Sequence, residues 1–110
     1  MRIHLLSKNT VEKYIDKNKQ SEVPLKSWLE SLRNADWAFP QEILRNFNSA
    51  DLLGRKSKRV VFNIGGNKYR IICQYHFGKS KVRLFVNWIG THAEYSKLCK
   101  AGKKYTIDEY

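Results

Sequence analysis

The sequence predicts an α+β fold with one small, mostly antiparallel sheet. Three consecutive segments, residues 59–64, 68–77 and 81–90, have the β-branched and aromatic composition of strands, and short turns separate them. Strands joined by tight turns pair antiparallel. The length of 110 residues is that of one domain. We therefore expect a single domain over residues 1–110, with a tail at residues 103–110 that is either extended or loose.

A short strand and two amphipathic helices are expected before this region. Residues 2–6 have strand character, and either Ser7 or Asn9 can cap the next helix, since Asn9 and Glu12 are spaced as in a capping box. A second helix is expected to begin with Pro24, whose missing N–H costs nothing at the first helical position. Its apolar residues recur at helical spacing and predict a buried stripe: Leu25, Trp28, Leu29 and Leu32.

The predicted strands alternate between two faces. Gly65, Gly66 and Asn67 tolerate positive φ and predict a hairpin turn. After this turn, one face carries Tyr69, Ile71, Cys73, Tyr75 and Phe77, and the other carries Lys68, Arg70, Ile72, Gln74 and His76. In the last strand, Val82, Leu84, Val86 and Trp88 share one face, and Lys81, Arg83, Phe85, Asn87 and Ile89 share the other. One face is thus expected to cover a core while the other is partly basic.

A helix is predicted directly after the last strand. Thr91 and Glu94 have the spacing of a capping box, with Thr91 as N-cap. His92 and Tyr95 lie three residues apart and so on adjoining parts of one helical face. Gly102 is expected to end this helix.

The positive charge is unevenly distributed. The net charge is +11, but residues 1–55 hold 9 basic and 7 acidic side chains, whereas residues 56–110 hold 12 basic and 3 acidic ones. This footprint favours a polyanionic partner, and nucleic acid before an anionic membrane or an acidic protein. Residues 40–57 have no clear period, and residues 54–58 predict a basic turn, which is either a solvated loop or an edge of an RNA-binding surface.

Cysteine use and hydropathy indicate a cytoplasmic protein. Cys73 falls in a strand pattern and Cys99 in a helix pattern, so both are expected to be buried thiols and not a disulfide or a metal site. The apolar run after Arg2 is too short for a signal peptide, and no run approaches the roughly 18 residues of a membrane span. We expect no cofactor, no metal and no membrane association.

The residues that could do chemistry form a basic set. The sequence contains no HExxH, GxSxG or nucleotide-binding glycine motif. Metal-free cleavage of RNA needs a base for the 2′-OH, a cation for the phosphate and an acid for the leaving 5′-oxygen. Histidine, tyrosine, lysine and arginine can share these roles. The candidates are Lys68, Arg70, His76, His92, Tyr95 and Lys97. The same residues could instead serve plain binding, with His92 near a helix cap and Tyr95 packed on the sheet.

Two runs resemble a known family. The sequence VVFNIGGNKYRII, followed about twenty residues later by WIGTHAEYSKL, resembles the HigB-type toxins of bacterial toxin–antitoxin modules, within the RelE-like mRNA interferases. The resemblance covers about residues 22–100. It implies a compact fold with N-terminal helices packed on one face of the sheet and a C-terminal helix. It also implies ribosome-dependent, metal-independent cleavage of mRNA, and a HigA-type helix-turn-helix antitoxin through which alone operator DNA is bound.

The resemblance also suggests roles for single residues. Arg70, His92 and Tyr95 are the expected catalytic residues: Arg70 contacts the phosphate, His92 is general acid or base, and Tyr95 orients or stacks on the substrate or shares proton transfer. The expected RNA-binding residues are Lys68, His76, Lys97 and Arg59.

Two other readings stay open from sequence alone. A non-catalytic RNA- or ribosome-binding module would keep the basic face and tolerate loss of His92 and Tyr95. A protein-interaction domain would use that face only for an acidic partner.

Overall fold

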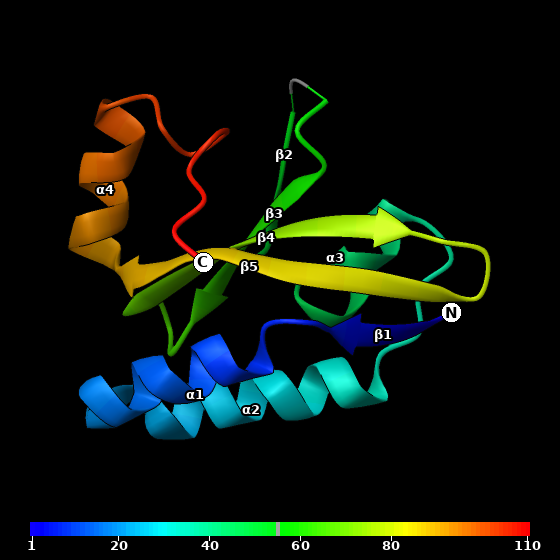
Figure 1. Cartoon of the computed structure of the whole chain (residues 1–110), viewed down its shortest axis with the longest axis horizontal. Coiled ribbons are helices and arrows are strands. Elements are labelled where there is room, and N and C mark those ends of the chain that lie inside the picture. The colour runs from blue at the N-terminus through cyan, green and yellow to red at the C-terminus, as the bar shows by residue number, and fades with distance from the viewer. Residues whose placement is uncertain (55) are drawn as a thin grey trace.

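The computed structural model describes residues 1–54 and 56–110, which form a five-stranded sheet with helices on both sides (Figure 1). The elements in chain order are β1 (Arg2–Leu5), α1 (Lys8–Lys17), α2 (Glu22–Asn34), α3 (Ile43–Asn46), β2 (Asp51–Leu53), β3 (Arg59–Ile64), β4 (Tyr69–Phe77), β5 (Lys81–Thr91) and α4 (His92–Lys100), with short 3₁₀ turns at Lys19–Ser21 and Pro40–Glu42. The predicted α+β class is confirmed.

The sheet is mostly antiparallel, as predicted. Its strand order is β1-β5-β4-β3-β2, and β1 pairs parallel with β5 while every other pair is antiparallel. The three consecutive strands β3, β4 and β5 form its centre. The short elements α3 and β2 lie in the segment without a clear period, where the sequence predicted no element.

The two long helices cover one face of the sheet (Figure 1). The predicted stripe of α2 is confirmed at Leu25, Trp28 and Leu32, which are buried, and Val11 and Ile15 of α1 join them. The main core combines these residues with the inward side chains of the strands, including Val60, Phe62, Ile71, Cys73, Val82, Leu84 and Val86. Their burial supplies the hydrophobic stabilisation that fixes the helix layer on the sheet.

Helix α1 starts at one of the two expected caps, Ser7, whereas α2 starts earlier than expected. Ser7 is the N-cap residue of α1, and its hydroxyl accepts a hydrogen bond from the Val86 N–H at 3.2 Å, so the capping box expected at Asn9 is wrong. The hydroxyl therefore ties the helix start to β5. Helix α2 begins at Glu22, two residues before Pro24. The proline is tolerated there because the N–H groups of a first helical turn have no partner within the helix.

A β-bulge changes the faces of β5. Ile72 pairs with Trp88 and Cys73 with Val86, so Asn87 has no partner in the ladder. Beyond the bulge, Ile89 joins the main core together with Val86, and Trp88 lies on the opposite face. The prediction that Trp88 shares a face with Val86 is therefore wrong, because strict alternation does not hold across an extra residue.

A second, smaller cluster covers the opposite face of the sheet. It is formed by Leu53, Val61, Ile72, Trp88 and Leu98, with Tyr95, Tyr105 and Ile107 packed against it. Helix α4 and the last residues of the chain supply the outer side. The backbone N–H of Glu109 donates to the Asn87 carbonyl at 2.8 Å, and Asn87 Nδ2 donates to Asp108 Oδ1 at 3.3 Å. The chain end thus lies on the bulge.

The two cysteines differ in their burial. Cys73 is fully buried, as predicted, and burial raises the pKa of its thiol; Cys99 is partly exposed, so the expectation for that thiol is wrong. The basic turn expected at residues 54–58 includes Arg55, which lies outside the described residues. In the described part of the chain, no helix combines the length and apolar character that crossing a membrane requires.

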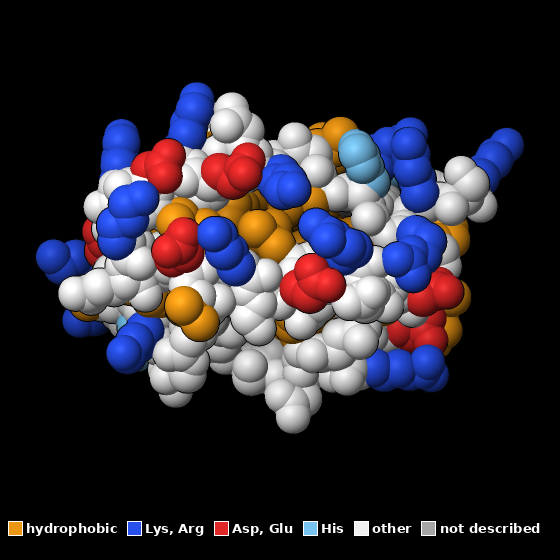
Figure 2. Space-filling model, turned by 90° about the horizontal axis from the view of Figure 1, so that it is seen from below, with side chains coloured by type: hydrophobic (Ala, Val, Ile, Leu, Met, Phe, Trp, Pro, Cys, Tyr) orange, Lys and Arg blue, Asp and Glu red, His pale blue; other side chains and the backbone are white. Residues whose placement is uncertain are grey.

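The helix layer carries mixed charge. Figure 2 shows the face below the sheet, where Lys and Arg side chains alternate with Asp and Glu. Two ion pairs lie on α2, Lys26 with Glu22 at 2.9 Å and Arg33 with Glu30 at 3.5 Å. A third joins Asp16 of α1 to Lys19 in the following 3₁₀ turn at 3.6 Å. The basic residues of 56–110 lie instead on β3, β4, β5 and α4, on the loops before and between these elements and on the chain end.

Candidate RNA-binding and catalytic site

The predicted hairpin between β3 and β4 forms one end of the candidate site. Gly65, Gly66 and Asn67 have φ values of 64°, 58° and 81°, and the Lys68 N–H donates to the Gly65 carbonyl at 3.3 Å. All three residues are thus in the left-handed region that glycine and asparagine tolerate. The turn brings Arg70 to the start of β4.

The strand register places Arg70 between Asn63 of β3 and Gly90 of β5. Arg70 is only 8% exposed. Its Nη1 donates to the Tyr69 carbonyl at 3.2 Å and its Nη2 donates to Asn67 Oδ1 at 3.3 Å. Both acceptors are neutral, and no ion pair with a carboxylate involves Arg70 within residues 1–54 and 56–110. The guanidinium therefore keeps an uncompensated positive charge and further N–H groups for an anion.

The junction of β5 and α4 is fixed against the same hairpin. The capping box is confirmed: Glu94 N–H donates to Thr91 Oγ1 at 3.2 Å, and Thr91 N–H donates to Glu94 Oε1 at 2.7 Å. The backbone N–H of His92 donates to the Lys68 carbonyl at 3.0 Å. His92 is thereby held at the first position of the helix with its side chain exposed.

Tyr95 lies one turn further along α4 and connects this helix to Arg70. Its ring centroid is 5.8 Å from Arg70 Cζ, which is within reach of a cation–π interaction, and 6.1 Å from the ring centroid of Trp88. Burial raises the pKa of the Tyr95 hydroxyl, and the hydrogen bond with Cys99 and the charge of Asp51 act in the same direction, while Arg70 opposes them. At neutral pH the Tyr95 hydroxyl is therefore protonated.

Gly90 is a residue of this site that the sequence analysis missed. A Cβ atom there would lie 2.4 and 2.5 Å from two ring atoms of Trp88 and 2.9 Å from Glu94 Oε1. Only glycine lets the indole fold over the strand opposite Arg70. A glycine inside a strand pattern often marks such a close approach, so a signal was present in the sequence.

The remaining predicted RNA-binding residues are spread over the molecule. Lys68 is exposed at the hairpin, and Lys97 is exposed on α4 beside a cavity of about 530 Å³ that the chain end also lines. His76 is exposed but lies six residues along β4 from Arg70, roughly 20 Å away at the rise of a strand. Arg59 is 6% exposed.

The guanidinium of Arg59 is bonded to the chain end. Its Nη1 donates to the Lys104 carbonyl at 3.2 Å and to the Ile107 carbonyl at 2.7 Å. Burial lowers the pKa of Arg59, and Asp108 opposes this. The RNA contact predicted for Arg59 stays a prediction, and it requires that the chain end release this side chain.

The site therefore joins four of the predicted residues and leaves three apart. Arg70 and Tyr95 are in contact, His92 precedes Tyr95 by one turn, and Lys68 holds the backbone of His92. Among the described residues, no three side chains of His, Cys, Asp or Glu are grouped as metal ligands usually are. The cations and protonated hydroxyl suit recognition of a phosphodiester.

Comparison with known proteins gives a consistent picture. The model of the HigB toxin family, described as the RelE-like toxic component of a toxin–antitoxin system, matches residues 21–98. The mRNA interferase HigB of Escherichia coli O6:H1 is 31% identical over 98 residues, which cover 89% of this chain and 93% of that protein. The mRNA interferase toxin HigB of Escherichia coli K12 is 25% identical over 93 residues, which cover 84% of this chain and 88% of that protein.

Proposed function

The chain belongs to the RelE-like HigB toxin family, and we propose that it is an mRNA interferase that cleaves translated mRNA on the ribosome. The observation that carries this proposal is the contact of Arg70, a nearly buried cation without a carboxylate partner in the described chain, with Tyr95 on the helix that begins at His92. Such a cation supports binding of a phosphate whose negative charge grows in the transition state.

The proposed reaction is metal-independent transfer of the phosphoryl group. The 2′-oxygen attacks phosphorus, the bond from phosphorus to the 5′-oxygen breaks, and a cyclic 2′,3′-phosphate and a 5′-hydroxyl form. A base takes the 2′-OH proton and an acid gives a proton to the leaving oxygen. We assign His92 to one of these two steps, because its side chain is exposed at the helix start.

The other residues have binding or orienting roles in this proposal. Arg70 contacts the non-bridging phosphate oxygens. Tyr95 keeps its proton, since burial raises the pKa of its hydroxyl, and it donates to the phosphate or stacks on a base. Lys68 and Lys97 are exposed on either side and grip the RNA backbone, and His76 contacts it further away.

The shape of the site supports a need for the ribosome. Its groups come from the hairpin, the β5–α4 junction and α4, and His92 and Lys68 are exposed side chains. A free RNA strand would lose much conformational freedom in aligning with them. A ribosome that already holds mRNA in a bent geometry supplies this orientation. The proposed partner that controls the activity in the cytoplasm is a HigA-type antitoxin, and operator DNA is bound only through the toxin–antitoxin complex.

A reconstituted translation reaction tests this proposal. We expect the wild type to cleave an mRNA on programmed ribosomes far faster than the same RNA free in solution. The slow cleavage of free RNA should continue when EDTA is added, because the proposed reaction needs no metal. Arg70→Ala should lose cleavage in both while circular dichroism shows the wild-type fold. Equal rates on free and translated RNA would contradict ribosome dependence, and full activity of Arg70→Ala would contradict the assigned site.

A further inference from the structure

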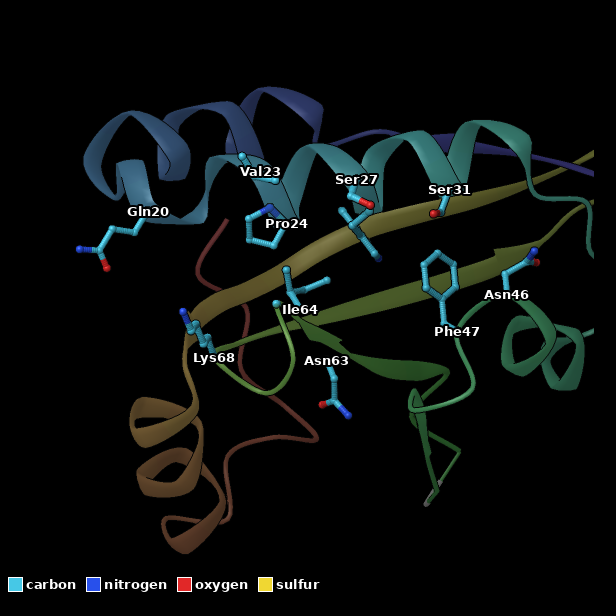
Figure 3. Close-up of a pocket in the computed structure, with 12 residues that line it drawn as sticks. Gln20, Val23, Pro24, Ser27, Ser31, Asn46, Phe47, Asn63, Ile64 and Lys68 are labelled. Carbon is cyan, nitrogen blue, oxygen red and sulfur yellow. The ribbon is translucent and has the colours of Figure 1, made fainter.

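A groove of about 560 Å³ lies between α2 and the β3–β4 hairpin, on the other side of the hairpin from α4 (Figure 3). Ser27 and Ser31 point into it from α2, and Ile64 and Phe47 point toward them from the opposite wall. Val23 and Pro24 form its end nearest the hairpin. We call this feature the α2–hairpin groove.

The walls of the groove are fixed by packing. The ring of Trp28 lies 5.3 Å from that of Phe62, and Phe62 lies 4.9 Å from Phe47, all with edge-to-face geometry. A Cβ atom on Gly65 would lie 3.3 Å from Pro24 Cβ, so the hairpin and α2 approach closely at one end. A partner would therefore meet a preformed surface and lose little free energy in ordering it.

The lining of the groove combines polar, aromatic and aliphatic residues. Val23 is 79% exposed, so its aliphatic side chain is available for contact with a partner at the end of the groove. Lys68 is the one charged side chain among the described residues that line the groove, and no carboxylate is among them. Trp28, which also lines the groove, has an indole Nε1 that is buried without a hydrogen-bond acceptor in the described structure. An incoming carbonyl would satisfy such a donor.

We infer that the α2–hairpin groove is a docking site for the antitoxin, and that it takes an acidic segment whose apolar side chain contacts Val23 and Pro24 and whose carboxylate pairs with Lys68. This inference rests on the proposed function, since it requires a protein partner of a toxin. Lys68 supplies the one charge among the described lining residues, and this positive charge makes an acidic segment the complementary occupant. RNA is a poorer fit, because a groove that follows a nucleic-acid backbone needs several cations, and Lys68 is the one cation in the described part of this lining.

The position of Lys68 links this groove to the candidate site. The side chain of Lys68 lines the groove, while its backbone carbonyl accepts a hydrogen bond from the His92 N–H at 3.0 Å. In the same hairpin, Arg70 Nη2 donates a hydrogen bond to Asn67 Oδ1. An antitoxin segment whose carboxylate pairs with Lys68 would therefore lie against the hairpin next to Arg70. It would hinder the approach of RNA along the hairpin and so inhibit cleavage.

The test compares variants of the exposed Val23, which should fold normally. The affinity of each for the antitoxin encoded with the chain in its operon is measured by calorimetry. We expect Val23→Asp to bind about tenfold more weakly or worse, because it removes an apolar contact and repels an acidic segment. Val23→Lys should lose less affinity for the antitoxin, because it also removes the apolar contact but adds a charge that attracts an acidic segment. Phe39→Asp is the matched control, since Phe39 is an exposed apolar residue (49%) that does not line the groove, and this variant should bind the antitoxin as the wild type does.

Cleavage is measured with the same variants, so that the two proposals are tested separately. Val23→Asp should cleave translated mRNA as the wild type does and should resist inhibition by the antitoxin. Unchanged affinity of Val23→Asp would overturn the docking inference. So would loss of cleavage with normal antitoxin binding, which would instead assign the groove to RNA. Absence of cleavage by the wild type would contradict the proposed function and not the groove.

Discussion

At the scale of single residues, Arg70 is held by neutral groups. Its guanidinium donates to a backbone carbonyl and to the carboxamide of Asn67, and its Cζ lies 5.8 Å from the ring centroid of Tyr95. A carboxylate in place of either acceptor would compete for the charge of Arg70 with the RNA phosphate that we propose it binds. The side chain of Asn67 therefore orients the arginine without neutralising it, while its backbone completes the turn.

Two substitutions of Asn67 separate these roles. Asn67→Gly keeps the positive φ and removes the acceptor; we expect an unchanged unfolding temperature and about tenfold lower kcat/KM, the value of one hydrogen bond to a charged group. Asn67→Asp keeps the acceptor and adds a negative charge. It should raise KM and reduce the salt dependence of RNA binding. Wild-type activity of Asn67→Gly would show that the residue serves the turn alone.

The protonation state of Tyr95 gives a pH prediction. Burial raises the pKa of its hydroxyl above the usual value near 10, so the group stays neutral across the range from about pH 6 to pH 9. Tyr95→Phe should lower kcat about tenfold through the lost hydrogen bond, while the shape of the pH profile is unchanged. The measurement is kcat against pH for both proteins. Loss of an alkaline limb in Tyr95→Phe would mean that the hydroxyl ionises in this range.

At the scale of elements, the irregular strand β5 sets the position of the Trp88 side chain at the candidate site. The bulge at Asn87 moves Trp88 to the face of Arg70, and Gly90 leaves room for its ring. This arrangement places the indole between the strand and Tyr95, at 6.1 Å from the tyrosine ring. The position of α4 over the sheet thus depends on one unpaired residue and one glycine.

Gly90→Ala tests this dependence. The added Cβ would lie 2.4 Å from the Trp88 ring, so the indole or the strand must move, and we expect a loss of about 1–3 kcal/mol in the free energy of unfolding. Denaturant unfolding measures it. Gly54→Ala is the control, because a Cβ there meets no described atom within 4 Å and should leave stability nearly unchanged. Equal stability of the two variants would contradict the packing described.

The sequence predicted most of the strands and helices, but not which face of the sheet the residues after the bulge in β5 lie on. The strands, the hairpin and the capped α4 have strong local signals, namely alternation, consecutive turn residues and the spacing of Thr91 and Glu94. The bulge was missed because an extra residue is set by pairing with β4 and not by local propensity. The three-residue β2 was missed because so short a strand has no period to detect. The contact of Arg70 with Tyr95 needs both the register and the bulge, so composition could suggest the site but not assemble it.

At the scale of the whole molecule, the hairpin is shared by two surfaces. On one side it presents Arg70 to α4, and on the other Lys68 and Gly65 close the α2–hairpin groove. The chain end lies on the same face as Arg70, where it binds Arg59 and the bulge. The candidate site, the groove and the chain end thus all lie next to the central strands β3, β4 and β5 (Figure 1).

The measurement that tests the central claim most directly is the mapping of mRNA 5′ ends after brief induction in a bacterial host, for wild type and His92→Ala. We expect growth arrest and new 5′-hydroxyl ends within translated messages for the wild type. His92→Ala should fold normally and give neither, because a general acid or base contributes about 10²–10⁴ in rate. Arrest without new ends, or the same ends with His92→Ala, would contradict an interferase that acts through this site.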